Sequence, residues 1–319
     1  MIFFLLAAHQ FVSAQDAYFS QFFINQLYYN PAFAGFNKDP EVLLSYRNYL
    51  LASQTAYLTY GASYNQYLDA VHGGVGLQLV RDQQGSGIFN KTSMDAMYAY
   101  HLKVNRFFSL QAGFQVSYMM KNFDNSNLIL PDMFNPSTGD FIPTQAPVAS
   151  YHKNFPDFSL GILGIAPNFY MGFSAHHVTE PNEAFDAGQT TRLSRKYTFI
   201  TGMTIPLKNI RYGKEEVTLN PALLYQNEKS FQQLNYGLLI KFSPLSAGIW
   251  AREDKDLSFN SLIFSIGYNQ DFYEINYSYD MAVSSIKRAN FAVHEVTFRI
   301  KFKYNKTRKL HEAIKCPKI

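Results

Sequence analysis

Apolar and polar residues alternate one by one over several long stretches of this chain, and this two-residue period is what most limits its fold. Between residues 109 and 120 every even position is apolar, and the odd positions up to 117 are polar or glycine. The pattern recurs over residues 234–242, 273–280 and 295–304. Side chains of a β-strand point alternately to two faces, whereas a helix repeats every 3.6 residues. The alternation therefore predicts β-strands with one apolar and one polar face.

Composition separates a membrane barrel from a soluble β-protein. Only 16% of the 319 residues are charged, whereas 17% are aromatic and 47% are hydrophobic. A soluble domain usually has about a quarter charged residues, and no stretch here approaches the roughly 18 apolar residues of a membrane helix. These features favour a transmembrane β-barrel, whose lipid-facing and lumen-facing residues alternate. The alternative is a soluble all-β sandwich or barrel, but its strands are rarely this long.

The stretches predict an all-β, transmembrane outer-membrane β-barrel over residues 41–304, with about fourteen antiparallel strands. We place them at residues 41–51, 55–66, 72–81, 91–103, 106–121, 158–166, 168–177, 195–206, 215–225, 230–243, 244–253, 258–268, 270–280 and 290–304. Connections after even-numbered strands are mostly tight, whereas the two longest, residues 122–157 and 178–194, follow odd-numbered strands. Short turns of outer-membrane barrels are periplasmic, so we expect both termini in the periplasm.

Three segments lie outside the predicted strands. Residues 1–14 resemble a signal peptide, because an apolar stretch precedes the small-x-small sequence Val12-Ser13-Ala14, although no basic residue comes first. Residues 15–40 are aromatic and rich in Asn, and would plug the periplasmic mouth, lie against the barrel wall or form an ordered lead-in. Residues 305–319 form a basic tail, which is either a solvated end or a contact for an acidic periplasmic partner.

Six charged residues fall on the polar side of their predicted strands, and we assign them to the lumen. They are Arg47, Arg252, Glu274, Asp280, Glu295 and Arg299. A charge facing lipid at the bilayer centre costs about 2–4 kcal/mol, so a barrel would turn these side chains inward. Inside, they would either pair and close the pore or line a hydrated lumen.

The sequence offers little catalytic chemistry. His176-His177 with Glu180 and Glu183 has metal-ligand residue types, but adjacent residues of a strand point to opposite faces. The cluster Gly73-Gly74-Val75-Gly76 lacks the spacing of a phosphate-binding loop, so we interpret it as thin barrel wall beside a bulky neighbour. We find no nucleophile and base pair. We expect no catalytic activity, no cofactor, no metal and no nucleic-acid partner.

The chain resembles the PorP/SprF family, outer-membrane proteins of the type IX secretion system of Bacteroidota. The resemblance begins with Phe19-Ser20-Gln21 and with Asn30-Pro31-Ala32-Phe33-Ala34-Gly35, which stand where the family has F-S-Q and N-P-A-x-A-G. It continues along the chain with Tyr46-Arg47-Asn48, Trp250-Ala251-Arg252, Tyr277-Ser278-Tyr279-Asp280, His294-Glu295 and the Cys-Pro ending at Cys316. Each motif is short, but together they cover nearly the whole mature chain.

The resemblance implies a non-enzymatic barrel that helps a secretion and gliding machine deliver or retain large surface adhesins with a C-terminal sorting domain. Its partners would be outer-membrane lipid, periplasmic secretion machinery and one such adhesin. The residues we expect to face partners lie in the two terminal segments: Phe19, Asn30, Pro31, Gly35, Arg308, Lys309 and Cys316. Two alternatives remain, a passive outer-membrane channel for small or apolar solutes and, less favoured, a barrel enzyme.

Overall fold

A computed structural model of the chain describes residues 16–50, 57–85, 87–124, 150–186, 188–209, 216–229, 231–254, 258–283 and 292–303. The signal-peptide region and the basic tail, with Arg308, Lys309 and Cys316, lie outside these residues. No helix in the described ranges has the length and apolar character needed to cross a membrane.

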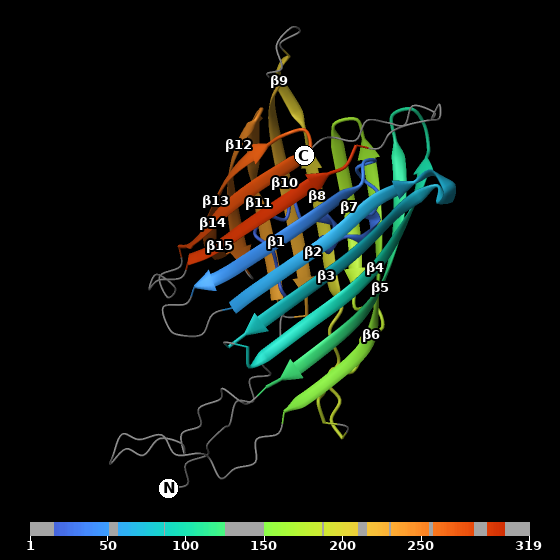
Figure 1. Cartoon of the computed structure of the whole chain (residues 1–319), viewed down its shortest axis with the longest axis vertical. Helices are drawn as coiled ribbons and strands as arrows, with labels where there is room; N and C mark the ends of the chain where they lie inside the picture. The colour runs from blue at the N-terminus through green and yellow to red at the C-terminus, as the bar shows by residue number, and fades with distance from the viewer. Residues whose placement is uncertain are drawn as a thin grey trace.

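The described strands form one closed antiparallel barrel (Figure 1). They are β1 (Glu41–Leu50), β2 (Tyr57–Leu68), β3 (Gly73–Gln84), β4 (Phe89–Lys103), β5 (Ser109–Phe123), β6 (Tyr151–Ala166), β7 (Phe169–His176), β8 (Lys196–Met203), β9 (Ile205–Asn209), β10 (Glu216–Glu228), β11 (Phe231–Phe242), β12 (Leu245–Asp254), β13 (Ser258–Asn269), β14 (Tyr273–Ala282) and β15 (Ala292–Lys301). The ring closes where β1 pairs with β15, with Glu41 opposite Lys301.

The barrel has fourteen strands because β8 and β9 are two parts of one strand. Both pair with β10, β8 along its second half and β9 along its first. The interruption falls at Thr204, whose backbone N–H donates to Asn168 O. On the partner strand β10, the register with β9 shifts between Val217 and Thr218. Proline at 206 also removes a backbone donor from this part. Counting β8 and β9 together confirms the predicted number of strands.

The start of one strand was predicted wrongly. The sixth strand was expected from residue 158, but β6 begins at Tyr151, so Pro156 lies inside it. β6 pairs with β5 along its full length, whereas its pairing with β7 begins only at Leu160. The first half of β6 therefore has one regular strand neighbour, and a proline is tolerated there because a donor can be lost on the open side.

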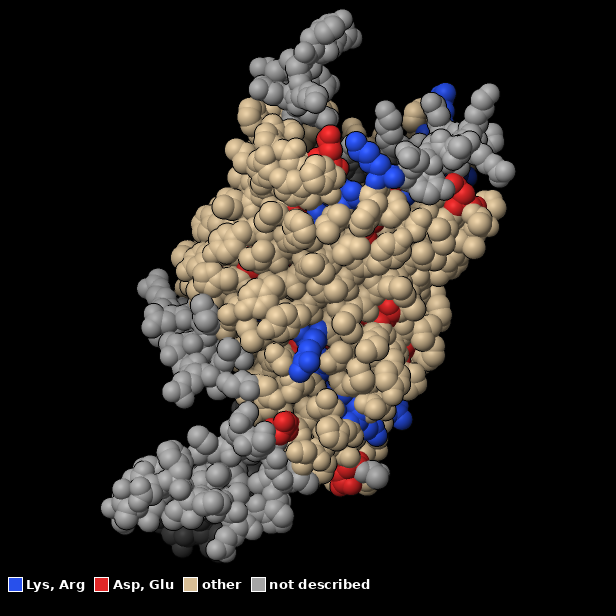
Figure 2. Space-filling model, viewed as in Figure 1, with Lys and Arg blue, Asp and Glu red and all other residues tan. Residues whose placement is uncertain are grey.

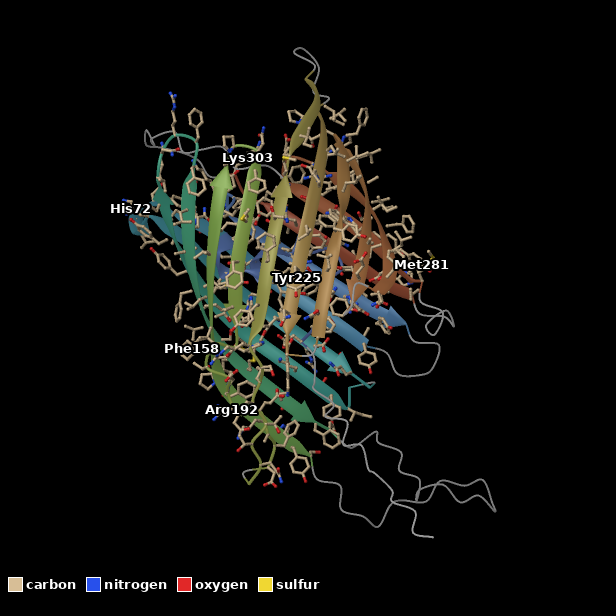
Figure 3. All side chains as sticks on the ribbon, turned by 180° about the vertical axis from the view of Figure 1, so that it is seen from behind. His72, Phe158, Arg192, Tyr225, Met281 and Lys303 are labelled. Atoms are coloured by element: carbon tan, nitrogen blue, oxygen red, sulfur yellow. The ribbon has the colours of Figure 1, made fainter. Side chains whose placement is uncertain are left out.

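The outer face of the barrel is apolar and the inner face is polar. On β5 the even-numbered residues from Leu110 to Tyr118 are exposed, and the odd-numbered residues from Gln111 to Met119 are buried. Aromatic and aliphatic side chains project from the wall (Figure 3), and charged side chains are sparse on the wall seen in Figure 2. This is the reverse of a soluble protein and fits a wall that faces lipid.

The two ends of the barrel differ. At the end near His72, connections are short, among them 104–108, 167–168, 243–244 and 270–272; we call it the short-turn end. The opposite end carries the connections 124–150 and 177–195 and is called the long-loop end. His72 and Arg192 mark these two ends in Figure 3. Residues 177–195 turn back onto the barrel, since Leu193 packs against Met119 and Phe155.

Candidate functional site

Residues 16–36, called here the lumen segment, lie inside the barrel (Figure 1). Asp16 contacts side chains near the long-loop end, whereas Ala34 contacts His101 near the short-turn end, so the segment runs along the barrel before β1 begins. A 14-stranded barrel is wider than the 8-stranded kind that wall side chains can fill alone. The lumen segment supplies the missing interior.

The lumen segment is held in a compact shape by its own residues. A single helical turn, α1 (Gln26–Tyr29), is followed by the 3-10 turn η1 (Pro31–Phe33). Asn30 caps η1, because its Oδ1 accepts a 2.8 Å hydrogen bond from Ala32 N, and Pro31 starts the turn without needing a donor. Gly35 has φ 68°, a left-handed conformation that favours glycine. These roles account for the sequence Asn-Pro-Ala-Phe-Ala-Gly.

The barrel wall is thin where this turn rests on it. Cβ atoms added to Gly74 or Gly161 would lie 2.0 Å from Ala34 O or Asn30 Oδ1. Asn30 Nδ2 then donates to Ile162 O at 3.1 Å and to Phe173 O at 3.2 Å, the carbonyls of two residues paired between β6 and β7. The interpretation of Gly73–Gly76 as thin wall is confirmed at Gly74.

Aromatic side chains of the lumen segment fill the middle of the barrel. The ring of Phe23 stacks on Trp250 with centroids 4.5 Å apart, and the ring of Phe22 meets the same indole edge to face at 5.1 Å. Phe33 and Phe36 pack against Tyr170 of β7. These buried rings form the largest hydrophobic cluster of the described residues, and it lies in the lumen rather than in the wall.

The sequence Phe19-Ser20-Gln21 is bound by charged residues of the wall. The backbone N–H groups of Ser20 and Gln21 donate to the two carboxylate oxygens of Glu295, at 2.6 and 3.2 Å. Gln21 also donates from Nε2 to Glu295 O and accepts at Oε1 from Thr297 Oγ1. A buried carboxylate thus satisfies two amide donors that the irregular backbone leaves without partners.

Four of the six charged residues predicted to face the lumen lie together around Ser20 and Gln21. Glu295 lies 3.9 Å from Arg47 Nε, and Arg252 forms an ion pair with Asp280. The guanidinium groups of both arginines lie over the ring of Tyr18, at 4.2 and 4.8 Å from its centroid. The motifs that carry the family resemblance on β1, β12, β14 and β15 therefore converge on residues 18–21.

The remaining two of these charges, Glu274 and Arg299, lie closer to the short-turn end. Arg299 Nη1 is 3.4 Å from Glu274, and its Nη2 donates to Ile24 O at 3.0 Å. Lys301 joins the same carboxylate at 3.0 Å. All six residues are buried, and the ion pairs formed by both groups lie inside the barrel.

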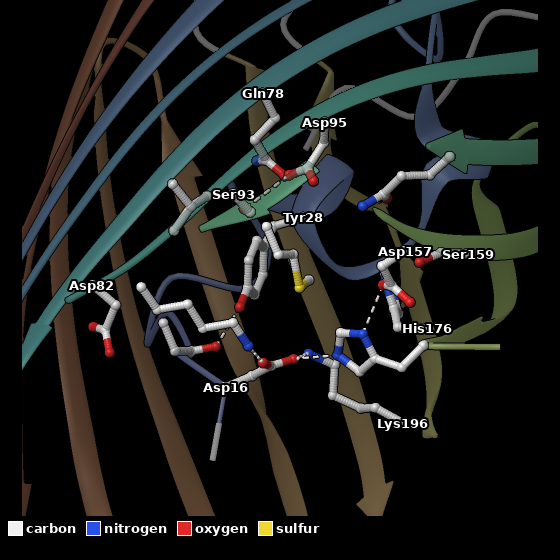
Figure 4. Close-up of a pocket in the computed structure, with 16 residues that line it drawn as sticks. Asp16, Tyr28, Gln78, Asp82, Ser93, Asp95, Asp157, Ser159, His176 and Lys196 are labelled. Carbon is white, nitrogen blue, oxygen red and sulfur yellow. Dashed lines mark hydrogen bonds and ion pairs between the residues drawn. The ribbon is translucent and has the colours of Figure 1, made fainter. Parts of the chain in front are cut away.

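A third ionic group, which the sequence pattern did not indicate, holds the start of the lumen segment (Figure 4). The Asp16 carboxylate accepts from Lys91, Lys196 and His177, and the other ring nitrogen of His177 donates to Asp157 at 2.7 Å. Burial alone would raise the pKa of Asp16, but the two lysines and His177 lower it well below its usual range. Burial likewise opposes the charge on His177, but Asp16 and Asp157 raise its pKa.

Adjacent residues of a strand were expected to point to opposite faces, but His176 and His177 are both buried inside the barrel. His176 Nε2 donates to Tyr29 O at 3.0 Å, and His177 is also buried, because it leaves the strand with φ 57°. Glu183 pairs with Lys121 instead of approaching them. Within the described ranges, no group of three His, Cys, Asp or Glu side chains is arranged to hold a metal.

The partner-facing candidates of the lumen segment are not on the surface. Phe19, Asn30, Pro31 and Gly35 are buried between the segment and the wall. They would meet another protein only if the segment left the lumen.

Comparison with known proteins gives a family. The family model described as type IX secretion system membrane protein PorP/SprF matches residues 11–300. No curated protein matches the sequence. Among solved structures, a Pseudomonas aeruginosa FadL homologue is 12% identical with a TM-score of 0.46, over 86% of this chain and 93% of that one. The Acinetobacter baumannii outer membrane protein Omp33 is 10% identical with a TM-score of 0.45, over 83% and 98%. Since the family model covers almost all of the barrel, the chain belongs to the PorP/SprF family of type IX secretion system membrane proteins.

Proposed function

We propose that this outer-membrane protein is a non-enzymatic component of the type IX secretion machinery, and that it helps to secrete or retain large cell-surface adhesins. The observation that carries the proposal is the filled lumen. Aromatic rings of the lumen segment cover Trp250, and its backbone is hydrogen-bonded to Glu295 and Arg299. A barrel closed in this way supports a role as a docking or retention component rather than as a pore.

The alternative function is a passive channel for small or apolar solutes. The polar inner face is compatible with it. However, the charged side chains of the inner face pair with each other and hydrogen-bond to the lumen segment, instead of facing an open column of water. A channel would require the segment to leave the barrel. The two functions therefore differ in the state of residues 16–36.

We further propose that the short-turn end faces the periplasm, where secretion machinery can reach it. The lumen segment starts near the opposite, long-loop end, so the expectation that both termini are periplasmic is kept here only for the C-terminal tail. Support comes from the rule that periplasmic turns of outer-membrane barrels are short. β1 starts and β15 ends at this end, so the basic tail 305–319 would begin there. An acidic periplasmic partner would then contact the tail, and the adhesin would be held at the long-loop end.

The experiment combines gene deletion with conductance measurement. Deletion should abolish surface display of one or a few large adhesins, measured by antibody labelling of intact cells, while sensitivity to large antibiotics stays unchanged. The purified barrel should show no steady conductance in planar bilayers. Unchanged surface display after deletion, or a steady open conductance of the wild-type barrel, would refute the proposal in favour of the channel.

A tail deletion separates partner docking from folding. Removing residues 305–319 should leave the barrel in the outer membrane, because its last strand β15 ends at Lys301. Adhesin display should fall if the tail contacts the secretion machinery. Normal display without the tail would place that contact on another surface.

A further inference from the structure

A small cavity lies between the start of the lumen segment and the inner faces of β4, β5 and β6 (Figure 4). Its volume is about 40 Å³, which is room for a small ion with a water molecule. Strand pairing brings its lining residues together, since Asp95 is opposite Ser117 and Ser117 is opposite Asp157. Two residue pairs further along, at the next inward-facing position, Gln115 is opposite Ser159.

Four side-chain oxygens that line this cavity have no hydrogen-bond partner. They are Asp95 Oδ1, Gln115 Oε1, Asp157 Oδ1 and Ser159 Oγ. The four residues are at most 7% exposed, and Asp157 and Ser159 are fully buried. Buried polar atoms normally have a partner, so a group of unpartnered atoms calls for a ligand or ordered water. Because all four are oxygens, two of them from carboxylates, they call for a cation.

The charge around the cavity is also unbalanced. Four carboxylates line it, those of Asp16, Asp82, Asp95 and Asp157, against the two lysines Lys91 and Lys196 and the ring of His177. Even with His177 protonated, the count is four negative against three positive charges. Both lysines are bound to Asp16, and both ring nitrogens of His177 are occupied. None of these cations is paired with Asp95, which accepts hydrogen bonds from serine hydroxyls.

We propose that this cavity binds a hard cation of the calcium class, between Asp95 and Asp157. Carboxylate, amide and hydroxyl oxygens are the ligands that Ca²⁺ takes in flexible geometry with added water, whereas Mg²⁺ demands a stricter octahedron. Zinc and copper prefer nitrogen or sulfur ligands, and the nearby imidazoles already make hydrogen bonds. Each of the two carboxylates offers one unpartnered oxygen, so the cation also uses Gln115, Ser159 and water. It would link β4, β5 and β6 beside the ionic group that holds Asp16.

The test uses the full-length protein in detergent after treatment with EDTA. Calcium chloride should raise the thermal unfolding midpoint, and a single calcium ion per chain should be found by native mass spectrometry. The double variant Asp95→Asn/Asp157→Asn should lose both effects. Asp69→Asn, at the short-turn end outside the cavity, should keep both and controls for calcium bound elsewhere on the protein or detergent.

Several results would overturn the assignment. They are an unchanged midpoint and no retained calcium in the wild-type protein, an equal rise in the double variant, or an equal rise from sodium chloride at the same ionic strength. If the double variant fails to fold, the single variants Asp95→Asn and Ser159→Ala replace it, and weaker calcium retention than in the wild type is then required. The site does not depend on the proposed function, because cation binding is measured without cargo or partners.

Discussion

The backbone N–H of Ser20 donates a 2.6 Å hydrogen bond to the carboxylate of Glu295, which joins the start of the lumen segment to the last strand of the barrel. The two residues are 275 positions apart in the sequence. Since β15 also pairs with β1 to close the ring, the bond fixes the segment beside the closing seam. The segment and the closed wall therefore stabilise each other.

Replacing Glu295 with Gln should strongly destabilise the folded barrel. The variant leaves Arg47 buried without its anionic partner, and removal of one member of a buried ion pair costs about 3 to 5 kcal/mol. The measurement is the free energy of unfolding in detergent from denaturant titration. Glu253→Gln is the control, because Glu253 bonds to Tyr236 on the outer side and should change stability by under about 0.5 kcal/mol. Equal losses in both variants would contradict the role given to Glu295.

Replacing Trp250 with Ala should destabilise the barrel through its interior. The indole is 1% exposed and packs against Phe22 and Phe23, and truncation of a buried aromatic residue costs about 3 to 5 kcal/mol. Phe264→Ala, at a lipid-facing position 44% exposed, is the control in the same sheet. Denaturant titration should rank Trp250→Ala as clearly the less stable. A cost no larger than that of the control would mean that the segment does not pack in the lumen in solution.

The strands could be predicted from the sequence because one physical cause, the difference between lipid and lumen, acts on every second residue. The two-residue period places Arg252 and Asp280 on the inner face. It does not predict that the two side chains meet, since β13 lies between their strands β12 and β14. The start of β6 was missed because Pro156 usually ends a strand, and only the late start of β7 pairing makes it tolerable.

The lumen segment could be recognised as unusual but not placed. Its contacts depend on inward glycines such as Gly161, which look like ordinary strand residues until a second chain segment lies against them. The ionic group around Asp16, called here the Asp16 anchor, takes Lys91 from β4, Lys196 from β8 and His177 from the position after β7. These elements are not neighbours in sequence order, so the group could not be predicted from it. One feature of Lys91 and Lys196 could have been recognised from the sequence, because both lie at inward-facing positions of their strands.

The Asp16 anchor should weaken as the pH rises above neutral. The folded pKa of His177 is raised, so its contribution to stability is present below the unfolded pKa, about 6.5, and is lost as the pH rises through the folded value. The lowered pKa of Asp16 acts only in acid. Thermal midpoints of the wild type should therefore fall from about pH 6 to about pH 9, and His177→Gln should flatten this slope. Parallel slopes in both proteins would exclude His177 as the cause.

The last prediction tests closure of the barrel by the lumen segment. Replacing Gly161 with Ala would place Cβ 2.0 Å from Asn30 Oδ1, too close for any real contact, so Asn30 must leave the paired carbonyls of Ile162 and Phe173. The wall itself should stay intact, because alanine is compatible with a strand. Planar-bilayer recordings should then show open conductance that the wild type lacks.

Gly164→Ala is the matched control on the outward face of the same strand, where the nearest atom is a Phe108 ring carbon at 3.3 Å. It should remain closed. A Gly161→Ala barrel that folds with normal heat-modifiability but conducts no more than Gly164→Ala would show that the turn at Asn30 does not hold the lumen shut.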